Sequence, residues 1–217
     1  MSKAAEKIMY FVRHGQSEGN VSPVFQSTDS PLNESGLAQA EKVADRISKL
    51  SFDTLIASPL TRAKETATAI ANKTGKEPEY SDLFVERVKP TQIIGKSYED
   101  ESANALWETW EKSLHTPGLR AEDGENFDDL VARADKALAF LAARDEASLV
   151  VVTHGYFLRT IVARVLLGST LTGGAFQNFQ ARIAMENTGI TVLKYTDGWD
   201  GMAWRLWIYN DHAHLGD

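Results

Sequence analysis

Two histidines in the sequence, His14 and His154, each follow a short apolar run and precede a glycine. Arg13 stands directly before the first of them, and Arg62 lies a few residues after another apolar run. A neutral imidazole can attack phosphorus and form a phosphohistidine that water later hydrolyses. Guanidinium groups are permanently charged, forked donors that suit a phosphate. Together these residue types predict phosphoryl-transfer chemistry on an anionic ligand.

The apolar runs are the elements that must bring these side chains together. They are short and nearly continuous, as in the buried strands of a parallel sheet, and they span residues 8–12, 52–58 and 148–153. Segments with helical periodicity separate and follow them, at residues 34–50, 59–75, 126–143 and 156–167. Crossover connections keep such strands parallel, and ligands bind at the carboxyl ends of strands in open α/β sheets. We therefore expect the two histidines and the two arginines to meet at one end of the sheet.

Capping residues predict where these helices begin and end. Asn33 is expected to cap the helix over 34–50. Ser58, with Pro59 at the first helical position, is expected to cap the next helix, and Gly75 to end it. The helix N-termini after Ser58 and after Gly155 would offer free N–H groups and a positive dipole to a bound phosphate.

Phosphoryl transfer assigns roles to these side chains. We expect one histidine to be the nucleophile, and the other, with Arg13 and Arg62, to bind the phosphoryl oxygens. Nearby positive charge disfavours the imidazolium and keeps the attacking ring neutral. A leaving alkoxide also needs a proton donor, and Glu86, just after the apolar "LFV", is the natural candidate.

The segment from about 84 to 124 is the least regular part of the chain. It contains Pro90, Pro117 and many charges, with Trp107 and Trp110 three positions apart on a short helix. We interpret it as a small cap inserted over the site, with the two tryptophans packed inside it.

The C-terminal region has two alternating runs, "ITVLKY" and "AWRLWIYN", which predict a hairpin at a sheet edge. The terminal "HAHLGD" places His212 and His214 two apart, and we interpret it as a polar tail rather than a metal-binding pair. The predicted fold class is α/β: a single domain over 1–217, formed by a three-layer αβα sandwich with a mostly parallel sheet, an antiparallel edge hairpin and the cap insertion.

The composition, 43% hydrophobic and 24% charged, is typical of a globular domain. The net charge of -7 argues against nucleic acid or an anionic membrane as partner. No cysteine is present, which excludes disulfides, thiolate catalysis and cysteine-ligated zinc. The first apolar run is too short for a signal sequence or a membrane span. We expect a cytoplasmic protein with a small-molecule partner, and the edge hairpin permits a homodimer without requiring one.

Four motifs, in this order, resemble those of the histidine phosphatase superfamily, the phosphoglycerate mutase-like fold: "RHGQSEGN", "SPLTRAKETA", the Glu of "LFVER" and "VVTHG". The resemblance runs from residue 8 to about 156. It implies a phosphorylated nucleophile at His14, a proton donor at Glu86 and a pocket asparagine at Asn20. It implies no metal and no cofactor. The phosphoryl-binding residues that it implies are Arg13, Arg62 and His154.

The cap decides between hydrolysis and isomerisation. Cofactor-dependent mutases of this family resemble one another in a "YG…G.NK"-like stretch after the acid and in a later Arg-Arg pair. This chain has "ERVKPTQIIGKSYEDES" there and no Arg-Arg pair. We therefore predict a metal-independent phosphomonoesterase that acts on a small phosphorylated metabolite through a phosphohistidine, with a cofactor-dependent phosphoglycerate mutase as the alternative.

Two other classes of protein fit the sequence less well. A non-catalytic module that only binds a phosphorylated ligand would have lost the nucleophile or the acid, and neither is missing. A metal-dependent hydrolase using His14, His154 and carboxylates would need a tight ligand cluster, which the sequence lacks.

Structural roles compete with the functional ones for single residues. Glu86 could have only the structural role of pairing with Arg87 or Lys89. Asn20 is also a good turn or cap residue. The cations Arg87, Lys89 and Lys96 in the cap are hypothesised to contact an anionic part of the substrate.

Overall fold

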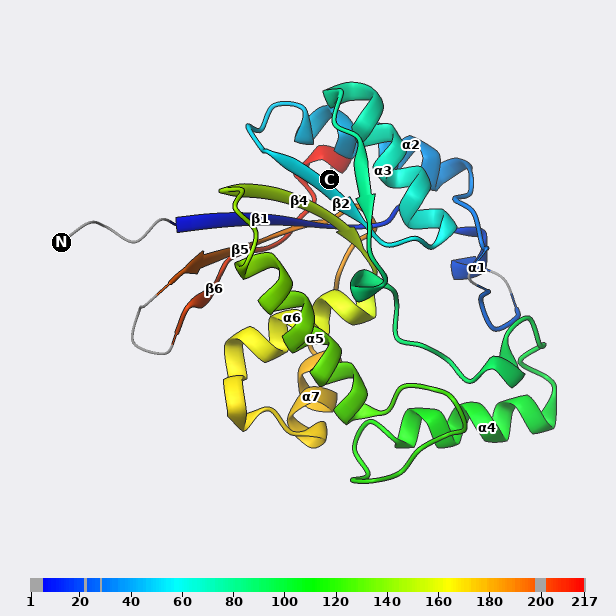
Figure 1. The fold of residues 1–217 in the computed structure, drawn as a ribbon. Helices are drawn as coiled ribbons and strands as arrows, with labels where there is room; N and C mark the ends of the chain where they lie inside the picture. Colours follow the sequence, from blue (N-terminus) through cyan, green and yellow to red (C-terminus); the bar gives the residue numbers. More distant parts are fainter. Residues whose placement is uncertain (1–5, 22, 28, 198–201, 217) are drawn as a thin grey trace.

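The computed structural model describes residues 6–21, 23–27, 29–197 and 202–216, and its centre is a six-stranded sheet of order β3-β2-β4-β1-β5-β6 (Figure 1). The strands are β1 (Glu6–Arg13), β2 (Thr54–Ala57), β3 (Pro78–Tyr80), β4 (Ser148–Thr153), β5 (Ile190–Thr196) and β6 (Trp204–Asp211). The first four are parallel to one another, β5 is antiparallel to β1, and β6 is antiparallel to β5. The mostly parallel sheet with an antiparallel edge pair is confirmed.

Helices cover both faces of this sheet. The α-helices are α1 (Glu18–Val21), α2 (Glu34–Ile47), α3 (Thr61–Thr74), α4 (Glu101–Lys112), α5 (Phe127–Ala142), α6 (Gly155–Leu167) and α7 (Gly173–Gln180). α2 and α3 lie on one face, and α5 and α6, with α7 beside them, lie on the other (Figure 1). These are the three layers that the sequence predicted.

Strand β4 shows why the layers form. Leu149 and Val151 join the hydrophobic cluster shared with α5 and α6, whereas Val150 and Val152 join the cluster shared with α2 and α3. Successive side chains of a strand point to opposite faces, so a continuous apolar run supplies both layers at once. All four residues are fully buried, which explains why this run lacks polar alternation.

The N-cap residue of helix α2 is the one predicted from the sequence, but the first residue of helix α3 is not. The Asn33 side chain accepts a hydrogen bond from the backbone N–H of Gly36 at 2.8 Å. Helix α3 begins at Thr61 with Leu60 as its N-cap and has no side-chain cap, so the predicted start at Ser58 was wrong.

The Ser58 hydroxyl has another use. It accepts the backbone N–H of Leu60 at 3.3 Å within a tight turn, and it lies 2.8 Å from the ring Nε2 of His154. The helix end agrees with the prediction, because Gly75 closes α3 with a φ of 69°, a left-handed conformation that favours glycine.

Strand β3 has only three residues. It ends at Tyr80 because the Ser81 hydroxyl accepts the backbone N–H of Leu83 at 3.3 Å and starts a 3-10 turn over Asp82–Phe84. Helix α7 was not predicted, since its first turn begins with two glycines and its apolar pattern is brief.

The cap is a distinct layer beyond the sheet. It contains the 3-10 turn Thr91–Ile93 and α4, which lie away from the strands (Figure 1). Trp107 packs on a small cluster of Phe25, Ile93 and Ala103. Trp110 is buried, and its indole N–H donates to the carbonyl of Val88 at 3.0 Å. Both tryptophans therefore pack inside the cap, as expected.

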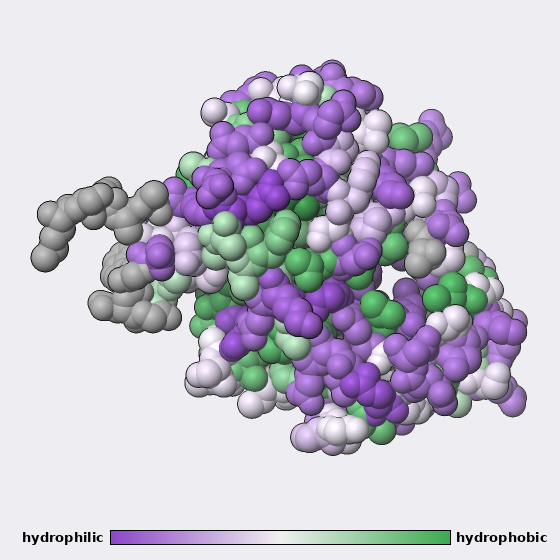
Figure 2. All heavy atoms as spheres, viewed as in Figure 1, coloured by the Kyte–Doolittle hydropathy of each residue, from purple (hydrophilic) through white to green (hydrophobic). Residues whose placement is uncertain are grey.

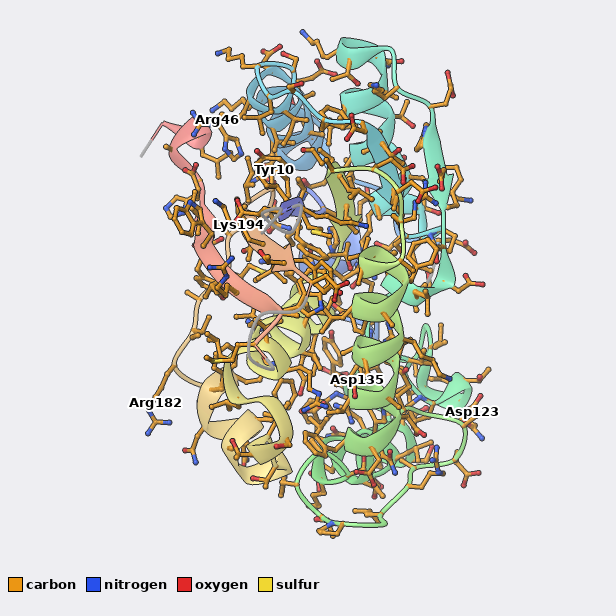
Figure 3. All side chains as sticks on the ribbon, turned by 60° about the vertical axis from the view of Figure 1, so that its left-hand side comes forward. Tyr10, Arg46, Asp123, Asp135, Arg182 and Lys194 are labelled. Atoms are coloured by element: carbon orange, nitrogen blue, oxygen red, sulfur yellow. The ribbon has the colours of Figure 1, made fainter. Side chains whose placement is uncertain are left out.

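Hydrophilic side chains cover most of the face drawn in Figure 2, which is hollowed between the sheet-bearing body and the cap. Charged residues such as Asp123 and Arg182 extend outward from the fold (Figure 3). Among the described residues, no helix combines the length and the apolar character that crossing a membrane requires.

Candidate active site

The register of two parallel strands brings the two histidines together. Arg13, the last residue of β1, pairs with Thr153, the last residue of β4. The next residue on each strand is a histidine, and the ring centroids of His14 and His154 are 4.9 Å apart. Neighbouring strands are about 4.8 Å apart, so this contact follows directly from the sheet. The predicted meeting of the two histidines is confirmed.

The hydrogen bonds of His14 fix its tautomer. Its Nδ1 lies 2.6 Å from the carbonyl oxygen of Gly15, which can only accept, so Nδ1 carries the proton. Its Nε2 lies 3.2 Å from the Nε–H of Arg62, which can only donate, so Nε2 holds a lone pair. The ring is thereby held as the tautomer whose Nε2 is a nucleophile.

Electrostatics favour the same neutral state. Burial, followed by the charges of Arg62 and Arg13, holds the pKa of His14 well below its usual value of 6.5. Only 2% of the residue is exposed, so water does not screen these charges effectively. His14 is therefore neutral, and able to attack, at any ordinary working pH.

His154 is fully buried with one ring nitrogen unused. Its Nε2 contacts the Ser58 hydroxyl at 2.8 Å, whereas its Nδ1 has no partner in the described part of the chain. The Nε of Arg13 is likewise buried and without a partner among the described residues. Buried polar groups are normally paired. Both nitrogens therefore keep hydrogen-bonding capacity that no residue in the described part of the chain uses.

Two arginines supply positive charge next to His14. Burial lowers the pKa of Arg62 to about 10, which still leaves the side chain charged at neutral pH. Arg13 donates through Nη1 to the carbonyl of Met185. A Cβ on Gly155 would lie 3.0 Å from Arg13 Nε, so an alanine here would push the guanidinium by a few tenths of an ångström.

Glu86 reaches the site from the cap junction. Its carboxylate accepts the backbone N–H groups of Tyr156 and Phe157, in the first turn of α6, at 3.2 and 3.0 Å, and that of Arg87 at 3.0 Å. Oε2 accepts one of these bonds and Oε1 two, so Oε2 keeps more free lone-pair capacity. No ion pair joins Glu86 to Arg87 or Lys89 within the described residues.

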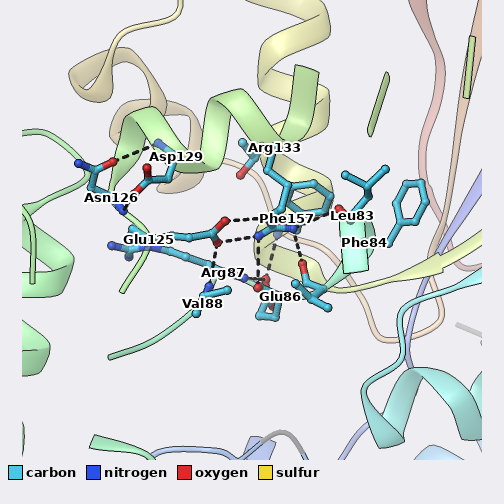
Figure 4. A network of polar contacts seen from close by, with 12 residues as sticks. Leu83, Phe84, Glu86, Arg87, Val88, Glu125, Asn126, Asp129, Arg133 and Phe157 are labelled. Atoms are coloured by element: carbon cyan, nitrogen blue, oxygen red, sulfur yellow. Dashed lines mark hydrogen bonds and ion pairs between the residues drawn. The ribbon is translucent and has the colours of Figure 1, made fainter. Parts of the chain in front are cut away.

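Arg133 of α5 pins the backbone that carries Glu86 (Figure 4). Its guanidinium donates to the carbonyls of Leu83 at 3.2 Å, Val85 at 2.8 Å and Glu86 at 3.3 Å. It also forms an ion pair with Glu125 at 2.7 Å. The position of the Glu86 carboxylate is therefore set by a rigid helix rather than by the cap.

A cavity of about 210 Å³ lies between these residues and the cap. Arg62 and Glu86 line it on the body side and Lys89 on the cap side. Much of the remaining wall is apolar, formed by Leu60, Val85, Val88 and Ile94. A phosphoryl group at His14 would thus face a pocket for the alcohol to which it is esterified.

Asn20 does not line this cavity. It is exposed in α1, and its side-chain oxygen accepts the backbone N–H of Ser17 at 3.0 Å. That geometry is the turn role that the sequence also allowed. Contact between Asn20 and a ligand stays a prediction.

A family model for the histidine phosphatase superfamily, branch 1, matches residues 9–209. The chain belongs to this superfamily. A probable phosphoglycerate mutase GpmB from Photorhabdus laumondii is 30% identical over 216 residues, which cover 95% of this chain and 94% of that relative. The resemblance inferred from the four motifs is confirmed.

Solved structures of similar proteins extend over nearly the whole chain. A mycobacterial glucosyl-3-phosphoglycerate phosphatase matches with a TM-score of 0.73 and 25% identity, covering 94% of this chain and 99% of that one. A phosphoserine phosphatase variant from Entamoeba histolytica matches with a TM-score of 0.73 and 23% identity, covering 96% and 99%. The second likeness shows the histidine phosphatase fold alone.

Several residues that shape this candidate site were not found from the sequence. The Thr66 hydroxyl accepts the Gly15 N–H at 3.1 Å, and its spacing of four from Arg62 on one helix face was a usable signal. Asn187 donates to the His14 carbonyl at 2.9 Å, and Arg133 pins the Glu86 segment. The last two act across long sequence separations, for which no local pattern exists.

The C-terminal tail is docked rather than loose. His214 Nε2 lies 3.0 Å from the Thr188 hydroxyl, and the Thr188 backbone N–H donates to the Arg13 carbonyl at 3.0 Å. Because the Thr188 hydroxyl donates to the Asn187 carbonyl at 2.7 Å, His214 Nε2 must be the donor in the first contact. The tail thus supports the backbone at the end of β1.

Proposed function

We propose that this superfamily member hydrolyses small phosphomonoesters through a phosphohistidine at His14. His14 Nε2 attacks phosphorus, the ester P–O bond breaks, and the leaving oxygen takes a proton from Glu86. Water then attacks the phosphohistidine and gives a proton to Glu86, the N–P bond breaks, and inorganic phosphate leaves. Every step uses side chains that the chain itself supplies, and no metal is needed.

The observation that carries this proposal is the fixed tautomer of His14. Its Nδ1–H is held by the Gly15 carbonyl, and its Nε2 lone pair faces Arg62. A histidine with only a structural role would gain nothing from two arginines that lower its pKa. Arg13, Arg62 and His154 would bind the phosphoryl oxygens, where negative charge is greatest in the transition state.

Hydrolysis is preferred to isomerisation because the chain lacks the Arg-Arg pair and the "YG…G.NK"-like stretch of the mutases, and because the structural neighbour at 25% identity is named as a phosphatase. The mutase is a second candidate, since the sequence relatives are named as probable phosphoglycerate mutases. In a mutase, the phosphohistidine returns its phosphoryl group to another hydroxyl of phosphoglycerate instead of to water. The two candidates therefore differ only in the second acceptor.

Phosphate release in the presence of a chelator, without added bisphosphoglycerate, tests the proposal. Wild type should hydrolyse a panel of phosphomonoesters, and His14→Ala should lose at least about a thousandfold in rate. His115→Ala is the matched control, because His115 is exposed and does not line the cavity, and it should retain wild-type activity. Isomerisation of phosphoglycerate without phosphate release would instead support the mutase. Tight binding of phosphomonoesters with no turnover would support the non-catalytic module.

The role of Glu86 has its own test. Glu86→Gln should slow alkyl phosphates by about a hundredfold or more, and 4-nitrophenyl phosphate far less, because an acidic phenol leaves without a proton. Equal losses for both substrates would show that Glu86 acts only by holding the start of α6.

A further inference from the structure

The peptide bond between His14 and Gly15 is held at both of its polar groups. Gly15 carries the carbonyl that accepts the Nδ1–H of His14 at 2.6 Å. A glycine backbone is not restricted by a side chain, so contacts from outside must set the orientation of this carbonyl. The Gly15 N–H donates to the Thr66 hydroxyl at 3.1 Å, and the His14 carbonyl accepts the side-chain amide of Asn187 at 2.9 Å.

The two residues that hold this peptide belong to different kinds of structure. Thr66 lies in helix α3 and is fully buried, and its hydroxyl donates to the carbonyl of Arg62 at 2.8 Å. A lone pair of that hydroxyl is therefore left for the Gly15 N–H. Asn187 lies in the turn before β5, where no helix fixes the backbone. The place of its amide depends on the residues beside it.

Thr188 fixes the backbone of Asn187 in an unfavourable conformation. Its φ is 61°, in the left-handed region, which a β-branched residue rarely adopts. Thr188 is fully buried, and its backbone N–H donates to the carbonyl of Arg13 at 3.0 Å. Its hydroxyl donates to the Asn187 carbonyl at 2.7 Å and accepts the Nε2–H of His214 at 3.0 Å. Strain of this kind persists only where the surrounding contacts over-determine it, and it is concentrated at functional sites.

The residues on either side of Asn187 and Thr188 are packed closely against β1 and β6. The carbonyl of Gly189 accepts the Arg13 N–H at 3.3 Å. The side-chain oxygen of Asn210 in β6 accepts the Glu186 N–H at 2.9 Å, and a Cβ on Gly189 would collide with the same oxygen. The turn over 186–189 is thus held between the two strands, and Asn187 has little freedom to move away from His14.

We propose that Asn187 is a positioning residue for the nucleophile, and that the strained backbone of Thr188 holds it in place. This inference rests on the proposed function and adds two residues to it. With the peptide held at both ends, the Gly15 carbonyl stays on Nδ1 of His14, and the Nε2 lone pair stays aimed at the incoming phosphorus. Asn187 and Thr188 do not line the cavity, so they act through His14 and not on the substrate.

The tautomer of His14 in the ligand-free protein tests the role of Asn187 without any substrate. Proton–nitrogen correlation spectra of protein with isotope-labelled histidine show which ring nitrogen carries the proton. Wild type should have the His14 proton on Nδ1 alone, and Asn187→Ala should show a mixture of the two tautomers. Asn178→Ala is the matched control, because Asn178 is exposed and contacts only its own helix and Arg182, and its spectrum should match wild type. An unchanged His14 signal in Asn187→Ala overturns the proposal, whether or not the wild type is an active phosphatase.

Kinetics add a second measurement for the same variant. Asn187→Ala should lower kcat for phosphate release by about tenfold to a hundredfold and leave KM nearly constant, because it misplaces the nucleophile while the walls of the cavity stay intact. A higher KM with unchanged kcat would instead place Asn187 in substrate binding and overturn its assignment as a positioning residue.

Two substitutions of Thr188 test the role of its backbone. Glycine adopts the left-handed conformation freely and keeps the backbone N–H, whereas valine keeps the side-chain shape but lacks the hydroxyl that compensates for the strain. Thr188→Gly should therefore stay closer to wild type than Thr188→Val, both in the tautomer of His14 and in kcat, although valine is the closer analogue of threonine. The opposite order, or equal behaviour of the two variants, would show that the strained backbone does not hold Asn187.

Discussion

The two buried histidines should make the protein unusually sensitive to mild acid. His14 is 2% exposed and His154 is fully buried, and the pKa of each in the folded state lies well below 6.5. In the unfolded chain both would titrate near 6.5. As the pH falls, the unfolded state binds these protons first. The stability that the neutral rings contribute is therefore complete above about pH 6.5 and declines below it, until the folded-state pKa is reached.

The size of this loss can be worked out for pH 5.0. The pH is then about 1.5 units below the pKa of an unfolded histidine, and at about 1.36 kcal/mol per unit this costs the folded state up to roughly 2 kcal/mol for each ring that stays neutral. Wild type should lose up to roughly 4 kcal/mol of unfolding free energy between pH 7.5 and 5.0 from this pair. His154→Gln, which places a neutral amide at one site, should lose roughly 2 kcal/mol less over the same range.

Urea unfolding at the two pH values measures both losses. A lower limit of pH 5.0 stays above the range where most unfolded carboxylates titrate, and His214, whose pKa burial also lowers, contributes equally to both proteins. If wild type and His154→Gln lose the same free energy on acidification, His154 is not held neutral by its burial, and the electrostatic description of the site is wrong.

Two further predictions follow from packing. Gly155→Ala should lower kcat/KM by about tenfold or more with little change in Tm, because the Cβ of the alanine would lie 3.0 Å from Arg13 Nε and displace the guanidinium. Gly174→Ala is the control and should leave activity intact, because a Cβ there meets no atom within 4 Å. Equal activity of the two variants would contradict this reasoning. Arg87→Met should lower the unfolding free energy by about 3 kcal/mol, measured by urea titration, because it removes the buried donor to the carbonyls of Trp110 and Glu125 and the ion-pair partner of Glu111. Arg120→Met, which breaks an exposed ion pair, should have little effect, and a similar loss in both would mean that Arg87 is not the anchor of the cap.

The sequence was sufficient for the parts of the site that depend on strand ends. His14 and His154 could be placed together because each follows an apolar run and parallel strands end on one side. Arg62 could be added because it lies in the first turn of the helix after β2. The exact start of that helix was missed, since Ser58 and Pro59 make a good cap signal that the contact with His154 overrides.

The supporting contacts could not be predicted in the same way. Arg133 holds the Glu86 backbone from 47 positions away, and Asn187 reaches His14 across 173. Such contacts depend on how whole helices and strands pack, and no periodic pattern in the sequence predicts them. The three cap cations show the same limit. All three are basic residues of one segment, and only their tertiary placement shows that Arg87 and Lys89 line the cavity and that Lys96 is exposed outside it.

The anchoring of the cap has a consequence for building chimaeras. Arg87 directly follows Glu86, the proposed proton donor, yet its guanidinium is held by Glu111 and by the carbonyl of Glu125. Glu125 in turn pairs with Arg133, which lies outside the cap. A segment exchanged between superfamily members to alter substrate choice would therefore have to include residues 86–125. The recipient chain would also need an arginine at position 133 that can pair with the residue at 125. A shorter graft that replaced only α4 would leave Arg87 without its partner Glu111 and would disturb the residue next to Glu86. Lost turnover in such a graft would therefore indicate that the contacts of Arg87 were lost, and would not show that the new cap fails to bind the substrate.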